Sequence, residues 1–215
     1  MPDLSTVRNA VLKSLAELVH RDNHLFGAQA NEDDLENPEF PAIKTRRKLH
    51  EVSINHRLAL YLEKNILPLI RNSGRQDPVF VDIEFNRKGC GLKGWVKNGK
   101  FIEVRPDIII HDRKDAKEKF NFLVVECKKS PASKLKLKRD LNKIRDFIQD
   151  KNYDYQFGLQ VVYGSGSIKE ITLCFNDAGV AKSDKQIRSE LGIYLSNLES
   201  GIASGMTFEQ IFSEN

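Results

Sequence analysis

A strand–helix–strand pattern between residues 120 and 164 constrains the fold more than any other feature of the sequence. The apolar run FNFLVVECK (120–128) predicts a buried strand, and QFGLQVVYG (156–164) predicts a second one. Between them, SPASKL opens a helix that runs to about Gln149. A helical crossover between two strands of one sheet makes them parallel, so we expect an α/β fold. The apolar residues at helical spacing in this helix are Leu137, Leu141, Ile144 and Ile148.

Other strands are expected on either side of this unit. Residues 78–86 alternate between apolar and polar side chains, which is typical of a half-buried strand. The segments 101–111 and 170–176 are two further apolar strands. The glycine-rich segment 87–100 predicts a loop or a hairpin with a wide tip.

Apolar residues at helical spacing predict helices over 4–20 and 50–71, and the tail 181–215 is expected to form one helix and a short second one. The predicted architecture is a restriction-endonuclease-like core with a mixed central β-sheet in the order α-β-β-β-α-β-β. Helices flank this sheet, and extra helices lie at the N- and C-termini.

The length of 215 residues fits a single domain spanning 1–215. Within it we expect a core over 48–176, an N-terminal helix plus a loop or flap over 1–47, and a C-terminal helical appendage over 177–215. The flap is expected because the sequence from about residue 21 to residue 48 loses its periodicity and carries two prolines.

Composition excludes several classes of protein. The longest apolar runs are only a few residues, and the N-terminus has no apolar signal core, so we expect a cytoplasmic location. The three cysteines are far apart and form no C-x-x-C pair, which argues against a disulfide framework or a zinc ribbon. His20 and His24 could share a helix face, but two ligands do not make a zinc site.

Two charged residues interrupt the apolar run at 120–128. Glu126 and Lys128 are two positions apart, so their side chains point to the same face of a strand. Asp107 is out of place in the same way, because it follows Pro106 and precedes three isoleucines. Proline supplies no backbone donor and favours an edge or a bulge, which would expose the next side chain.

Carboxylates at the ends of adjacent strands repel each other unless a cation lies between them. Oxygen ligands from Asp107, Glu126 and the backbone carbonyl of Cys127 would suit Mg²⁺, and Lys128 could orient or deprotonate a water and stabilise charge on a phosphate. The plainer alternative is a surface ion pair at a strand end and a Pro-Asp turn.

The sequence RPDIII followed by LVVECKK, with Glu126 nineteen residues after Asp107, resembles the PD-(D/E)XK nuclease superfamily. The resemblance covers roughly residues 48–176, including the order of elements, and extends to uncharacterised bacterial and phage-type members. It implies that Glu51, Asp107 and Glu126 bind Mg²⁺, with Mn²⁺ as a possible substitute, and that Lys128 activates water. Glu51 matches the glutamate that such proteins carry on the helix before the first strand. Glu32 is a rival acid, but it lies in a segment that reads as loop.

The net charge of the chain is mildly positive, at +4, and basic residues are concentrated in a stripe that begins near the end of the third predicted strand. Such a stripe is typical of a surface that contacts phosphates, although a solvated helix face has the same composition. The expected nucleic-acid-binding residues are Lys129, Lys134, Lys136, Lys138, Arg139 and Lys143. Supporting polar residues around the site are expected at Glu84, Arg87 and Gln156.

The leading hypothesis is therefore a Mg²⁺-dependent nuclease that hydrolyses phosphodiester bonds of DNA, in phage defence, restriction or repair. DNA is favoured over RNA as partner, and a homodimer or a larger defence complex is compatible with the sequence. The alternative is a non-catalytic nucleic-acid-binding or regulatory module on the same fold. A third hypothesis is a subunit whose tail helices recruit a larger effector.

Overall fold

The computed structural model covers the chain from residue 1 to residue 215. It describes residues 1–26, 51–84, 87–88, 91–92, 94–97, 99–114, 119–164 and 166–212. The expected flap, including Glu32, lies mostly outside these ranges. Residues 21–26, at its start, complete the first helix and form a short 3₁₀-helix, η1 (Asn23–Phe26).

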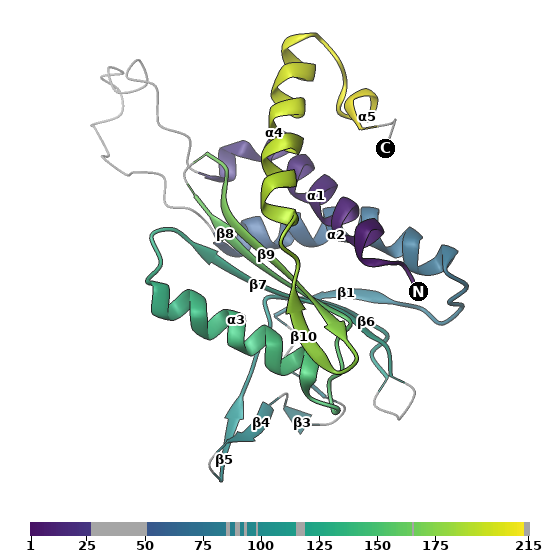
Figure 1. Ribbon diagram of the computed structural model, residues 1–215, viewed down its shortest axis with the longest axis vertical. Coiled ribbons are helices and arrows are strands. Elements are labelled where there is room, and N and C mark those ends of the chain that lie inside the picture. Colours follow the sequence, from purple (N-terminus) through teal and green to yellow (C-terminus); the bar gives the residue numbers. More distant parts are fainter. Residues whose placement is uncertain are drawn as a thin grey trace, which may run out of the picture.

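A six-stranded mixed sheet forms the centre of the molecule, with strand order β1-β6-β7-β8-β9-β10 (Figure 1). Only the β7–β8 pair is parallel among these strands, and helix α3 (Lys134–Gln149) makes the crossover between them. The predicted mixed sheet flanked by helices is confirmed. The strand bounds are β1 (Phe80–Ile83), β6 (Ile108–His111), β7 (Asn121–Lys129), β8 (Phe157–Tyr163), β9 (Ile168–Asp177) and β10 (Val180–Ser183).

Helices cover both faces of this sheet (Figure 1). On one face, α1 (Leu4–Arg21), α2 (Glu51–Asn72) and the start of α4 (Ile187–Ala203) share a large apolar core with alternate residues of β6, β7 and β8. On the other face α3 packs through Ile144, Phe147 and Ile148. Helix α3 packs so closely on the sheet at Gly158 that a Cβ at this position would collide with Ile144. The N-terminal helix is thus part of the main core.

The predicted strand over 101–111 is wrong, because the chain divides there into two strands of different sheets. Strand β5 (Lys100–Glu103) pairs with β4 (Gly94–Lys97) in a hairpin of its own, and only β6 joins the main sheet. The division falls at buried Pro106, which has no N–H to donate to a ladder. A further short pair, β2 (Arg87–Lys88) and β3 (Gly91–Leu92), lies in the glycine-rich segment.

The hairpin of β4 and β5 is fastened to the α3 face of the sheet. The Tyr153 hydroxyl accepts a hydrogen bond from the Gly94 amide at 2.7 Å and donates one to the Gly94 carbonyl at 2.8 Å. Trp95 packs edge-on against Phe147 with a centroid separation of 5.0 Å. These contacts place the chain that leads into Asp107 beside α3.

The tail begins with a strand rather than the expected helix. Strand β10 pairs with β9 through a tight turn in which Ala178 and Gly179 both have positive φ, at 52° and 84°. Positive φ at both central residues is the geometry of a type I′ hairpin, although Ala is an uncommon residue there. Helix α4 and the short α5 (Phe208–Ile211) follow, as predicted, and pack on α1 through a small cluster around Leu198 and Phe208. Across the described residues, every helix is too short or too polar to cross a lipid bilayer.

Candidate active site

Asp107 and Glu126 meet across the β6–β7 pair. The register joins Ile108 to Val125, so its extension by one position sets Asp107, just before β6, opposite Glu126 on β7. Asp107 Oδ2 accepts a hydrogen bond of 2.6 Å from the Cys127 amide, which fixes its carboxylate against β7. Burial raises the pKa of Asp107, although this hydrogen bond and nearby lysines oppose the shift. The two predicted acids are therefore brought together.

Glu126 is the most deeply buried charged group of the site, with 5% of its surface exposed. Burial raises the pKa of Glu126 to about 8, against the opposing attraction of Lys143. Lys143 Nζ, on α3, lies 2.6 Å from Glu126 Oε1. Nζ donates a hydrogen bond of 2.8 Å to the Arg105 carbonyl, whereas Oε1 has no partner at hydrogen-bonding angles. The contact of Lys143 with Glu126 is therefore short but lies outside hydrogen-bonding angles, and it is an ion pair when Glu126 is ionised.

Glu51 reaches the same end of the sheet from the first residue of α2. Its Oε2 accepts a hydrogen bond of 2.9 Å from the Lys129 amide, at the end of β7. Its other oxygen, Oε1, is 3.9 Å from Lys128 Nζ. The helix that carries Glu51 is tied to β7 one turn further on, where the Tyr163 hydroxyl lies 3.0 Å from Asn55 Oδ1 and 3.1 Å from Cys127 Sγ.

Lys128 stands between two carboxylates. Its Nζ is 3.9 Å from Glu51 Oε1 and also 3.9 Å from Asp140 Oδ2 on α3. Burial by itself would lower the pKa of Lys128, but Asp140, Glu51 and the other nearby acids outweigh it and raise that pKa. Lys128 therefore carries a positive charge at neutral pH.

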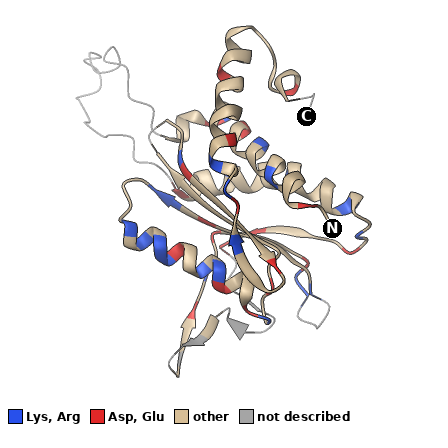
Figure 2. Cartoon of the chain, in the orientation of Figure 1, with Lys and Arg blue, Asp and Glu red and all other residues tan. Residues whose placement is uncertain are grey.

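Asp140 was missed by the sequence reasoning. Its Oδ2 is buried and has no hydrogen-bond partner, and burial raises the pKa of its carboxyl against the attraction of Lys128 and Lys143. An acid in the middle of a basic helix, three positions before Lys143, is the signal that could have pointed to it. Figure 2 shows the run of basic residues along α3 that this acid interrupts.

The cluster has an excess of negative charge. Four carboxylates (Glu51, Asp107, Glu126 and Asp140) interact with two ammonium groups (Lys128 and Lys143), which leaves a formal charge of −2 when all are ionised. This oxygen-rich donor set and its charge fit a hard divalent cation. The side chains are not gathered around one point, however: within the described ranges, no three His, Cys, Asp or Glu side chains are arranged to hold a metal ion.

Cys127 was expected to offer its backbone carbonyl. The structure assigns a role to its amide, which binds Asp107, while its side chain is fully buried on the opposite face of the sheet. Burial raises the pKa of the Cys127 thiol well above its usual range, so this thiol is not a nucleophile at neutral pH.

The three expected supporting residues have different positions. Glu84 follows β1 and binds the site through its backbone, because its amide donates a hydrogen bond of 2.9 Å to the Asp107 carbonyl. Arg87 begins β2, and its side chain lies outside what the structure describes. Gln156 is not brought to the site, because it precedes β8 at the end of the sheet where β7 begins. The register instead places buried Gln160 beside Glu126, with its side-chain amide donating to the Leu137 carbonyl at 2.7 Å.

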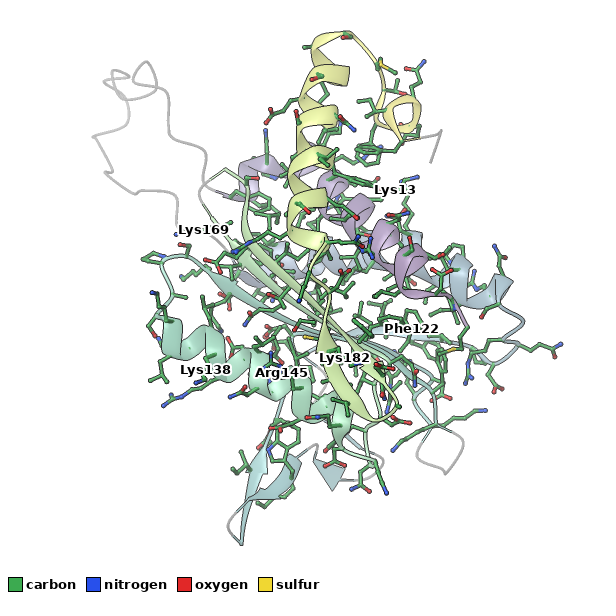
Figure 3. All side chains as sticks on the ribbon, viewed as in Figure 1. Lys13, Phe122, Lys138, Arg145, Lys169 and Lys182 are labelled. Carbon is green, nitrogen blue, oxygen red and sulfur yellow. The ribbon has the colours of Figure 1, made fainter. Side chains whose placement is uncertain are left out.

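The expected nucleic-acid-binding residues divide into two groups. Lys143 is turned into the site, with 21% of its side chain exposed, and pairs with Glu126. The others project into solvent from the end of β7 and from α3, where Figure 3 labels Lys138. These exposed residues are Lys129, Lys134, Lys136, Lys138 and Arg139.

The sequence was also compared with known families and proteins. Neither a protein-family model nor a curated protein matches this chain, so any function must be argued from the cluster around Asp107 and Glu126.

Proposed function

We propose that this chain is a Mg²⁺-dependent nuclease that hydrolyses phosphodiester bonds of DNA, with its active site at Glu51, Asp107, Glu126 and Lys128. The observation that carries the proposal is the pairing of Asp107 with Glu126 across β6 and β7 inside a cluster with excess negative charge. The two acids repel each other, and the nearby lysines offset only part of the negative charge of the cluster. A site for a divalent ion would account for this grouping of acids.

Asp107, Glu126 and Glu51 would hold the metal ion. When bound, Mg²⁺ would polarise a phosphate oxygen and lower the pKa of a water. The backbone hydrogen bonds to Asp107 and Glu51 would keep their carboxylates aimed at one end of the sheet. Lys128 is charged, which favours stabilisation of negative charge on the phosphate over removal of a proton from water.

Exposed basic residues of α3 would bind the nucleic acid beside these acids. The helix starts next to the end of β7, so lysines in its first turns lie on the same side of the sheet as Lys128. Charged residues of this kind contact the phosphate backbone and carry no sequence information. The order of elements supports a restriction-endonuclease-like core. From α2 to β9 it matches the expected α-β-β-β-α-β-β when the short pairs β2–β3 and β4–β5 are left out.

A cleavage assay tests the proposal. Purified protein is incubated with single- and double-stranded DNA and RNA in Mg²⁺ or Mn²⁺, alongside Asp107→Asn, Glu126→Gln and Lys128→Ala. Each substitution should reduce metal-dependent DNA cleavage by at least about a hundredfold, whereas Glu199→Gln, on the exposed side of α4, should leave it unchanged. Absence of cleavage of every substrate by the wild type contradicts the proposal.

The ion pair between Lys143 and Glu126 favours a second candidate, a non-catalytic nucleic-acid-binding module. In that case Lys143 permanently replaces the metal ion as the partner of Glu126. Calorimetric titration with Mn²⁺ and a DNA gel shift separate the two candidates. A module without catalysis binds DNA through α3 and takes up no Mn²⁺ at Asp107 and Glu126.

A further inference from the structure

Lys143 occupies an unusual position for a residue on a basic helix. Its ammonium group lies 2.6 Å from Glu126 Oε1 and is largely removed from solvent, so it cannot bind a phosphate in this arrangement. The positions around it on α3 include exposed lysines that lie free of the site. In this position the Lys143 ammonium group offsets the negative charge of Glu126, the most buried carboxylate of the cluster, which would otherwise attract a metal ion.

We propose that Lys143 is a built-in competitor of the metal ion, which occupies Glu126 in the metal-free protein and moves to Asp140 when a divalent cation binds. This inference rests on the proposed metal site and concerns its regulation. It makes Lys143 the residue that sets the affinity and therefore the metal concentration at which the site becomes loaded.

Two features of the contacts make this movement possible. The ammonium group donates a hydrogen bond to the Arg105 carbonyl, whereas its short contact with Glu126 lies outside hydrogen-bonding angles, so it can leave Glu126 and keep its hydrogen bond. Asp140 lies three positions earlier on α3, on the same face of the helix as Lys143. Its Oδ2 is buried without a hydrogen-bond partner, and its carboxylate already attracts Lys143 electrostatically. An acceptor is therefore in place for the displaced ammonium group.

The other charged groups of the cluster are less suited to this role. Lys128 Nζ lies 3.9 Å from carboxylate oxygens of both Glu51 and Asp140, so it makes no short contact with a proposed metal ligand. Asp107 is bound to a backbone amide that carries no net charge. Of the four carboxylates of this cluster, Glu126 is the one with a short contact to a positively charged side chain, that of Lys143.

The first experiment measures Mn²⁺ binding by calorimetry in the full-length protein. Lys143→Met should bind Mn²⁺ at least about tenfold more tightly than the wild type, because a competing charge has been removed. The metal-free variant should also melt at a lower temperature, since Glu126 is left buried without a partner. Lys151→Met removes the same charge from an exposed position beyond the end of α3 and should leave both quantities unchanged. If Lys143→Met does not fold, Lys143→Gln keeps a donor for the Arg105 carbonyl and should show the same gain in affinity.

The second experiment tests Asp140 through a double-mutant cycle. Asp140→Asn should weaken Mn²⁺ binding in the wild type and have a smaller effect in Lys143→Met, where no displaced ammonium group needs an acceptor. Equal effects in both backgrounds overturn the movement to Asp140. Equal or weaker Mn²⁺ binding by Lys143→Met and Lys143→Gln overturns the competition while the metal site stands. Failure of the wild type and both variants to bind Mn²⁺ overturns the metal site itself, and the competition with it.

Discussion

The Cys127 amide donates a hydrogen bond of 2.6 Å to Asp107 Oδ2 and so joins the end of β7 to the chain just before β6. The acid at the centre of the candidate site is thus also a structural acceptor. The Asp107 carboxylate thus has two roles. Its Oδ2 accepts a hydrogen bond from a backbone amide, and its negative charge contributes to the cluster. The two tasks can be separated by substitution.

Asp107→Asn should abolish metal-dependent cleavage while leaving the free energy of unfolding nearly unchanged, because the amide oxygen can still accept from Cys127. Asp107→Ala should abolish cleavage and also lower the free energy of unfolding by roughly 1–3 kcal/mol, since a buried amide loses its acceptor. Urea unfolding followed by circular dichroism, together with the cleavage assay, checks both. A fully stable Asp107→Ala protein contradicts this account of the hydrogen bond.

Tyr163→Phe should weaken the link between α2 and β7, because its hydroxyl joins Asn55 to Cys127 in a buried position. We expect a loss of about 1 kcal/mol in the free energy of unfolding. We also expect weaker Mn²⁺ binding, since α2 carries Glu51 at its first residue. Tyr155→Phe is the matched control, with a buried tyrosine on the α3 side of the sheet. An unchanged affinity in Tyr163→Phe shows that this link does not position Glu51.

The triple substitution Lys134→Ala, Lys136→Ala and Lys138→Ala should reduce DNA affinity and make it less dependent on salt. Each phosphate contact that is lost should lower the slope of log affinity against log salt by roughly one. Fluorescence anisotropy with labelled duplex DNA in Ca²⁺, which should not support cleavage, measures this slope. A slope equal to that of the wild type places the phosphate-binding surface elsewhere.

Acid should destabilise the protein through Asp82. Burial alone would raise the pKa of this carboxyl, but hydrogen bonds from His111 and Arg113 outweigh burial and hold it well below its usual value. The folded state therefore binds the proton more weakly than the unfolded state does. This contribution is fully present above pH about 4, the unfolded value, and is lost as the pH falls further. In Asp82→Asn the decrease in melting temperature between pH 5 and pH 3 should be smaller than in the wild type; an equal decrease contradicts the assignment.

Much of the fold could be predicted because periodicity reports directly on burial. Local patterns predict the strand at 120–128 and the helix after it, and the helical crossover predicts the parallel pairing with the strand that follows. The division at Pro106 was not predicted, because the apolar residues on either side continue the pattern while joining different sheets. Strand β10 was missed because a strand of four residues, three of them exposed, carries little signal, and the turn before it uses Ala178 at positive φ.

The sequence predicted part of the candidate site, because charged residues stand out against the apolar pattern of a buried strand. Asp107 and Glu126 were visible as charges inside apolar runs. The positions of Asp140 and Lys143 in the site depend on how α3 is rotated about its axis over the sheet. The sequence does not show which charged residues of this helix face the sheet. Gln156 was chosen because it precedes a strand, but the parallel pairing of β7 with β8 sets Gln160 beside Glu126.

The alternation along β7 has a consequence for how the chain finds its register. Leu123, Val125 and Cys127 enter the large apolar core, while Val124, Glu126 and Lys128 face α3. A slip of one residue would bury the polar side chains of Glu126 and Lys128 among the α1 and α2 contacts and turn a cysteine toward the acids. Glu126 and Lys128 therefore penalise such a misaligned pairing, so substitutions that replace them with apolar residues should make alternative alignments of β7 less unfavourable.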